Sequence, residues 1–198
     1  SSSPLSSGSY SYLISDYDCI INCVANTDTY SHDKKSHWNL NYDSVSKLVD
    51  LCNLNNQKLI HISTDYIYTN SNENASENDI PVHNKTWYGY TKLLGDAHVQ
   101  LKSNNYLLIR CGHKVTPFQY DKAFSNVTGN FDYVDKIASL IVKLIRNNAK
   151  GIINVGTERK TMYDLALKTN ANVNEDLSDN DLMPNNITMN LKKMESNI

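Results

Sequence analysis

Four short apolar runs alternate with longer amphipathic stretches along this chain of 198 residues, and this alternation limits the possible folds most strongly. An almost continuous apolar run of about four to eight residues is typical of a strand that a parallel sheet buries on both faces. The order strand, helix, strand, helix, strand, helix, strand predicts an α/β fold with a mostly parallel sheet and right-handed crossovers. The runs are Asp18–Val24, Lys58–Ser63, Tyr106–Cys111 and Gly151–Val155.

Apolar stripes at helical spacing predict the helices between these runs. Val45, Val49 and Cys52 lie on one side of such a helix, and residues 137–145 form a stronger stripe. Thr161 is of a residue type that caps helices, so we expect a helix to begin there. The expected helices span residues 34–56, 88–102, about 137–145 and 161–169. Residues 65–86, 112–132 and 170–186 are expected to be irregular, and 187–195 to form a last short element.

Charge and composition exclude several classes of function. A net charge of -2 and a pI near 6.3 argue against a general nucleic-acid or membrane-surface binder. No apolar run approaches the roughly 18 residues of a membrane-spanning helix. The cysteines lie in apolar runs without C-x-x-C spacing, so we expect reduced core thiols in a cytoplasmic protein. Residues 1–15 are expected to be a flexible lead-in without the features of a signal peptide.

The segment from Tyr88 to Lys92, with the sequence YGYTK, is the strongest candidate for chemistry. Residues four apart on a helix share a face, so the Tyr88 hydroxyl and the Lys92 ammonium can meet. A nearby ammonium favours the phenolate, so we expect a lowered pKa of Tyr88 and proton transfer near neutral pH. A chance pair of surface residues would have the same spacing.

A second polar group follows the strand predicted at residues 58–63. Ser63, Thr64 and Asp65 come at its carboxyl end, where open α/β sheets bind their ligands. A hydroxyl there can bond to a substrate carbonyl or alkoxide beside Tyr88. The alternative is that these three residues simply form a turn at the end of the strand. His61 is expected to be a packed core residue, and the six histidines form no metal-binding motif.

These motifs resemble those of the extended short-chain dehydrogenase/reductases, and within them the dTDP-4-dehydrorhamnose reductase (RmlD-like) family. Residues 59–68, LIHISTDYIY, are similar to the family signature HISTDYVF, and residues 87–96, WYGYTKLLGD, resemble VYGxSKLxGE. The resemblance runs from about residue 16 to the C-terminus. It implies a Rossmann-like, mostly parallel sheet with a small C-terminal substrate-binding part. Residues 18–28, 39–41, 132–138, 151–156 and 183–191 resemble further family motifs in the same order.

The resemblance also implies an activity and the residues that perform it. The expected activity is NAD(P)H-dependent reduction of a nucleotide-linked 4-keto-6-deoxy sugar, with NADP or NAD as cofactor. Thr64, Tyr88 and Lys92 match the catalytic residues, with Tyr88 as the proton donor. The expected partners are a nucleotide-sugar substrate and, as two options, a second copy of the chain or the missing N-terminal segment. The matched cofactor-binding positions are Ala25, Asn41, Ser63, Tyr88 and Lys92.

One family feature has no counterpart in these 198 residues. The seven glycines form no G-x-x-G-x-x-G or G-x-G-x-x-G, which binds the pyrophosphate in this class of fold. The first predicted strand matches the fourth strand of the family. We therefore expect an N-terminally truncated Rossmann-like sheet with an exposed edge, either in a fragment of a longer or split protein or in a degenerate paralogue.

Three interpretations of the function stay open at this point, beside the possibility of a non-functional fragment with an exposed edge that aggregates. In the first, the chain is the reductase described above: residues 16–111 are a partial NAD(P)-binding domain with the catalytic Y-x-x-x-K, and residues 112–198 are a mixed substrate-binding segment that includes returning Rossmann elements. In the second, the chain is a nucleotide-sugar epimerase or dehydratase. In the third, it is a non-catalytic regulatory or binding protein of RmlD-like fold, because the glycine-rich phosphate loop is absent.

Overall fold

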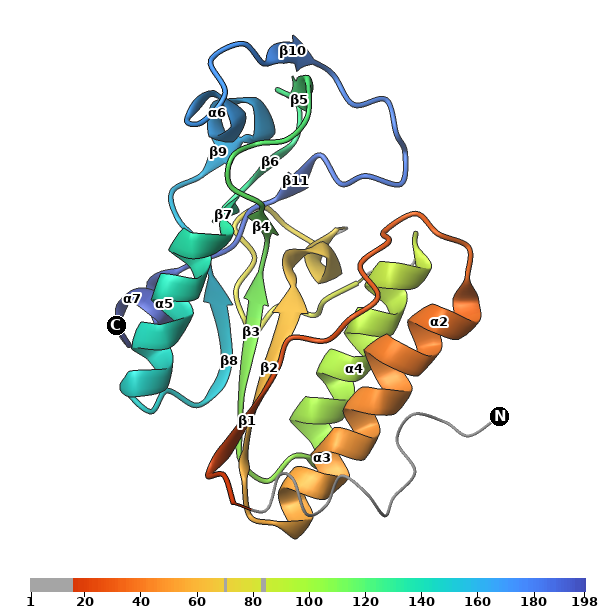
Figure 1. The fold of residues 1–198 in the computed structure, drawn as a ribbon, viewed down its shortest axis with the longest axis vertical. Coiled ribbons are helices and arrows are strands. Elements are labelled where there is room, and N and C mark those ends of the chain that lie inside the picture. Colours follow the sequence, from red (N-terminus) through yellow and green to blue (C-terminus); the bar gives the residue numbers. More distant parts are fainter. Residues whose placement is uncertain (1–15, 70, 83–84) are drawn as a thin grey trace.

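The computed structural model describes residues 16–69, 71–82 and 85–198, so the lead-in expected at residues 1–15 lies outside the described residues. Its centre is a parallel sheet whose four strands lie side by side in the order β1-β2-β3-β8 (Figure 1). The predicted α/β class and parallel sheet are confirmed. The strands are β1 (Cys19–Asn22), β2 (Lys58–Thr64), β3 (Tyr106–Cys111) and β8 (Gly151–Val155).

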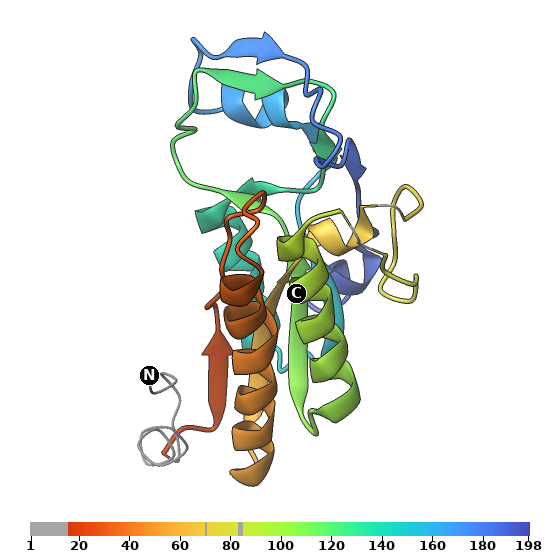
Figure 2. The same ribbon diagram turned by 90° about the vertical axis from the view of Figure 1, so that its right-hand side faces the viewer.

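Successive residues of the central strands are buried in two separate hydrophobic cores, one on each face of the sheet. Leu59 and Leu108 pack against the helices α3 (Ser44–Leu54) and α4 (Trp87–Lys102) on one face. Ile60 and Leu107 pack instead with α5 (Val134–Arg146) on the other face (Figures 1 and 2). Because neighbouring side chains of a strand point to opposite faces, burial on both faces requires a continuous apolar run.

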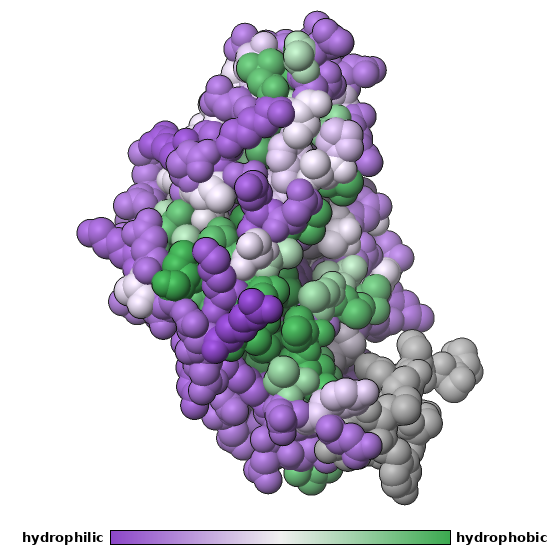
Figure 3. Space-filling model, turned by 60° about the vertical axis from the view of Figure 1, so that its left-hand side comes forward, coloured by the Kyte–Doolittle hydropathy of each residue, from purple (hydrophilic) through white to green (hydrophobic). Residues whose placement is uncertain are grey.

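The edge strand β1 departs from this pattern. Ile21 is 51% exposed and Val24 is 62% exposed, and Cys23 is also exposed. The space-filling view from the α5 side shows a hydrophobic area at the surface (Figure 3). The expected burial of this strand on both faces, and of every cysteine, is therefore wrong. All four cysteines are free thiols, but Cys52 and Cys111 alone are fully buried.

The helices agree with the apolar stripes, with one irregularity. The helix expected at residues 34–56 consists of α2 (Lys34–Trp38), the π-helical turn η1 (Asn39–Asp43) and α3. Thr86 caps α4 by accepting a hydrogen bond from the Gly89 backbone at 3.1 Å, which places Tyr88 in the first turn. None of the helices that the structure describes is both long and apolar enough to cross a membrane.

A smaller lobe at the carboxyl end of the sheet contains short strands where the sequence predicts irregular segments (Figure 1). It has its own core, in which Phe118, Phe131 and Leu165 are buried. Strands of two or three residues have no alternation that a sequence pattern can reveal. The lobe pairs β5 (Lys122–Phe124) with β10 (Asn174–Asp176), and β6 (Thr128–Gly129) with β9 (Lys160–Thr161) and β11 (Asn186–Ile187).

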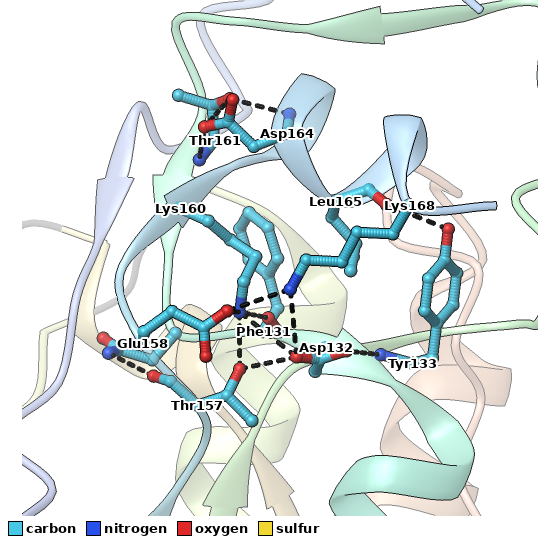
Figure 4. Close-up of polar contacts among 11 residues, drawn as sticks. Phe131, Asp132, Tyr133, Thr157, Glu158, Lys160, Thr161, Asp164, Leu165 and Lys168 are labelled. Atoms are coloured by element: carbon cyan, nitrogen blue, oxygen red, sulfur yellow. Dashed lines mark hydrogen bonds and ion pairs between the residues drawn. The ribbon is translucent and has the colours of Figure 1, made fainter. Parts of the chain in front are cut away.

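Short elements and a polar cluster connect the lobe to the sheet. The strand β4 (His113–Lys114) pairs with β7 (Asp132–Tyr133), which leads directly into α5. The buried Lys160 ammonium donates to Asp132 Oδ2 at 3.2 Å, and Thr157 donates to the same oxygen at 2.7 Å (Figure 4). As predicted, Thr161 begins a helix, α6 (Met162–Leu167), with Asp164 as its partner in a capping box (Figure 4). The last helix is α7 (Lys192–Glu195).

Candidate active site

Three of the predicted site residues come together at the carboxyl end of β2. Thr64 is the last residue of this strand and is buried. Tyr88, from the first turn of α4, forms a hydrogen bond with the Thr64 hydroxyl. Lys92, one turn later, is also buried, and its ammonium donates to the Ile62 carbonyl at 2.6 Å. Tyr88 and Lys92 therefore both face β2, as their spacing predicts.

The electrostatics of Tyr88 differ from the expectation. Burial raises the pKa of Tyr88 to about 12, although its hydrogen bond with Thr64 acts in the opposite direction. Burial also lowers the pKa of Lys92 to about 8. The predicted lowering of the Tyr88 pKa is therefore wrong, because desolvation has a larger effect on this pKa than the hydrogen bond with Thr64. The Lys92 ammonium is bonded to the Ile62 carbonyl.

A buried ion pair lies beneath this group and holds Ser63. Arg110 donates from Nε to Asp96 Oδ2 and from Nη2 to Asp96 Oδ1, each at 3.0 Å. The Ser63 hydroxyl donates to the same Asp96 carboxylate at 3.2 Å. The Ser63 side chain therefore lies beside the site, but its hydroxyl proton already forms a hydrogen bond within the protein. Its contact with a cofactor stays a prediction.

The other two predicted cofactor positions lie around the loop that follows β1. Asn41 is buried and exchanges two hydrogen bonds with the backbone of Asn26, at 2.8 Å and 3.0 Å. It also donates to the Thr91 hydroxyl at 3.1 Å, which fixes the loop against α4. Ala25 is half-buried in the same loop. Asn41 thus has a clear structural role, and cofactor contact by either residue stays a prediction.

Sequence reasoning assigned no role in the site to Asp65, Tyr66 or Tyr30, although Asp65 was recognised beside Thr64. The Tyr66 ring meets the Tyr88 ring edge-on with centroids 5.8 Å apart, and its hydroxyl lies 3.3 Å from that of Tyr30. Asp65 is buried directly behind Thr64. Thr64 also caps the 3-10 helix η2 (Asp65–Tyr68), so the strand-end turn and the predicted site coexist. The position of Asp65 and Tyr66 immediately after Thr64 was the available signal.

His61 is a packed core residue, as predicted. It is fully buried, pairs with the Asn22 side chain at 3.1 Å, and its pKa is lowered well below the usual range by burial. Within residues 16–69, 71–82 and 85–198, no group of His, Cys, Asp and Glu side chains is arranged to hold a metal ion. A polar cavity of about 490 Å³ lined by Asn130, Asn190 and other residues contains none of the predicted site residues.

The fold and this site together define a class of protein. A Rossmann-like parallel sheet with a hydroxyl at the end of one strand, beside a helix that carries Y-x-x-x-K, is the arrangement of the extended short-chain dehydrogenase/reductases. Within that class, the chain belongs to the RmlD substrate binding domain family, which matches residues 10–130. No curated protein sequence matches the chain.

Solved structures agree with this family. A hypothetical dTDP-4-dehydrorhamnose reductase from Sulfolobus tokodaii is 25% identical, with a TM-score of 0.78 over 91% of this chain and 74% of that one. The dTDP-4-dehydrorhamnose reductase from Bacillus anthracis in complex with NADP is 19% identical, with a TM-score of 0.77 over 91% and 74%. UDP-glucuronic acid 4-epimerase from Bacillus cereus in complex with NAD is 19% identical, with a TM-score of 0.74 over 96% and 68%. The last two likenesses are evidence of a shared fold.

Proposed function

We propose that this chain acts as an NAD(P)H-dependent reductase of a nucleotide-linked 4-keto-6-deoxy sugar, as the dTDP-4-dehydrorhamnose reductases do. The supporting observation is the meeting of Thr64, Tyr88 and Lys92 at the carboxyl end of β2, in a chain of this family and fold. Residues 16–111 would bind the cofactor and residues 112–198 the sugar. The compartment we propose is the cytoplasm, where the free thiols stay reduced.

Tyr88 is in the right protonation state for the reductive direction. With a pKa of about 12 it is a neutral phenol near pH 7, ready to donate a proton to the alkoxide formed at C4. Thr64 positions the reacting oxygen beside Tyr88. When bound, NAD(P)H supplies the hydride. The raised pKa of Tyr88 would hinder the reverse reaction, in which this residue must first lose its proton.

The residues present fit one end of a nicotinamide dinucleotide. Lys92 uses an N–H on the Ile62 carbonyl and has further N–H groups for the hydroxyls of the nicotinamide ribose. The pyrophosphate end has no glycine-rich turn among these 198 residues. The proposal therefore assigns residues of this chain to the nicotinamide end of the cofactor and not to its pyrophosphate end.

Titration of NADPH and NADH into the 198-residue chain by calorimetry tests the cofactor part of the proposal. We expect saturable binding, followed by NADPH oxidation in the presence of a 4-keto sugar nucleotide. Tyr88→Phe should keep the fold and lose about 10²- to 10⁴-fold in kcat. Tyr90→Phe is a matched control, because Tyr90 lies exposed on the same helix. A kcat of Tyr88→Phe close to that of Tyr90→Phe would contradict the proposal.

A second candidate function is that of a non-catalytic binding protein with the same fold. A folded chain that binds a nucleotide sugar but neither NADPH nor NADH would support it. An epimerase or dehydratase is distinguished by its redox balance, because it returns its cofactor unchanged. Net consumption of NADPH for each sugar converted would therefore exclude that alternative.

A further inference from the structure

The Asp65 carboxyl group is buried beside the proposed catalytic residues, and the proposed mechanism gives it no role. Asp65 is 3% exposed and directly follows Thr64. Its Oδ2 atom has no hydrogen-bond partner within the part of the chain that the structure describes. A buried carboxylate oxygen without a partner is costly, so its presence beside reactive groups needs an explanation.

The end of β3 provides the space for this carboxyl group. A Cβ atom at Gly112 would lie 2.1 Å from Asp65 Oδ2, so a side chain at this position would collide with the carboxyl group. Gly112 directly follows Cys111, which pairs with Thr64 across the sheet. The fold therefore places the carboxyl group at the joint between β2 and β3, next to the Thr64 hydroxyl.

The hydrogen bonds of Thr64 indicate what the carboxyl group does. A threonine hydroxyl has a single proton to donate. The Thr64 hydroxyl donates this proton to Asp65 Oδ1 at 3.3 Å and accepts from the Tyr66 backbone at 3.2 Å. The oxygen of the neutral Tyr88 hydroxyl, which interacts with Thr64, can also accept this proton. Asp65 and the Tyr88 oxygen therefore compete for the one proton of Thr64.

We propose that Asp65 is a positioning residue whose protonation state decides where the Thr64 hydroxyl proton points. Ionised Asp65 holds this proton, so Thr64 can then only accept hydrogen bonds. Protonated Asp65 releases it, and Thr64 can donate to the oxygen of Tyr88 or of a substrate carbonyl. This inference rests on the proposed function, because it assigns Thr64 and Tyr88 to the reaction.

The groups around Asp65 allow both of its forms. Lys114 on β4 favours the carboxylate, whereas Tyr66 on η2, Tyr88 on α4 and Cys111 on β3 all have pKa values raised by burial and are neutral near pH 7. Burial outweighs Lys114 and raises the pKa of Asp65 to about 6. Both forms are therefore present between about pH 5 and pH 7.

Carbon-13 NMR of the chain labelled at aspartate carboxyl and tyrosine ring carbons tests this directly. The Tyr88 signal is identified by its loss in Tyr88→Phe. We expect it to shift with a midpoint near pH 6, together with the Asp65 carboxyl signal. Asp65→Asn should remove this shift. Asp50→Asn, which removes an exposed charge from α3, should leave it unchanged.

The titration needs neither substrate nor cofactor, so it is decided separately from the reductase proposal. A Tyr88 signal that stays flat while Asp65 titrates, or a shift that persists in Asp65→Asn, overturns the inference. If Asp65→Asn does not fold, Lys114→Met replaces it. Loss of the Lys114 charge should raise both midpoints together by about one pKa unit, and a Tyr88 midpoint that stays in place overturns the inference.

Discussion

Among the polar contacts of the sheet, the buried pair of Arg110 and Asp96 should cause the largest loss of folding stability when one partner is replaced. Arg110 is 1% exposed and Asp96 is fully buried, and two hydrogen bonds of 3.0 Å join them. Arg110→Met removes the cation and leaves a buried carboxylate with only the donors of Ser63 and Gln100. Breaking one side of such a pair costs about 3–5 kcal/mol, because the remaining charge stays buried without its counterion.

This loss is measurable as a shift of the unfolding transition. At about 2–4 °C for each kcal/mol in a chain of this size, Arg110→Met should lower the Tm by roughly 6–20 °C. Thermal and urea unfolding followed by circular dichroism would measure it. The double variant Arg110→Met with Asp96→Leu should lose less stability than the two single variants lose together, by about 2 kcal/mol or more. The reason is that no buried charge then remains.

An exposed ion pair of equal length provides the control. Lys122 and Asp176 are also 3.0 Å apart, but their side chains are 66% and 38% exposed. Lys122→Met should therefore cost less than about 1 kcal/mol. A loss in Arg110→Met no larger than that in Lys122→Met would refute the argument from burial, as would strict additivity of the two core substitutions.

Three further predictions concern the cap, the smaller lobe and the site. Thr161→Ala removes the capping hydroxyl of α6 and should cost about 1 kcal/mol in urea unfolding, whereas Thr161→Ser should cost little. Lys160→Met removes the nearer of the two ammonium groups that pair with the buried Asp132 and leaves Lys168 at 4.0 Å, so it should cost about 2–3 kcal/mol; an unchanged unfolding midpoint would contradict this. The pKa of Asp65 is raised from 3.8 to about 6, so the folded state binds this proton more tightly than the unfolded state. The resulting stabilisation is complete below about pH 4, and about 3 kcal/mol is lost as the pH rises through 6, a loss that Asp65→Asn should abolish.

Local pattern was sufficient for most of the sheet and helices. The bounds of β3 and β8 agree with the predicted runs, because strands buried on both faces must be continuously apolar. The same rule failed for β1, since burial of an edge strand depends on what lies over it and not on its own residues. The short strands of the smaller lobe pair residues about 30 to 60 positions apart, and such pairing has no local signature.

The sequence alone determined which residues are candidates for chemistry, because the spacing of Tyr88 and Lys92 on a helix and the place of Thr64 after a strand are local properties. Tertiary structure decided their electrostatics. Burial raised the pKa of Tyr88. The packing of the chain placed the Lys92 ammonium against the Ile62 carbonyl and the Asp65 carboxyl group against Gly112. Proton affinity depends on solvent exclusion and on neighbours brought from distant strands, so only the folded chain sets it.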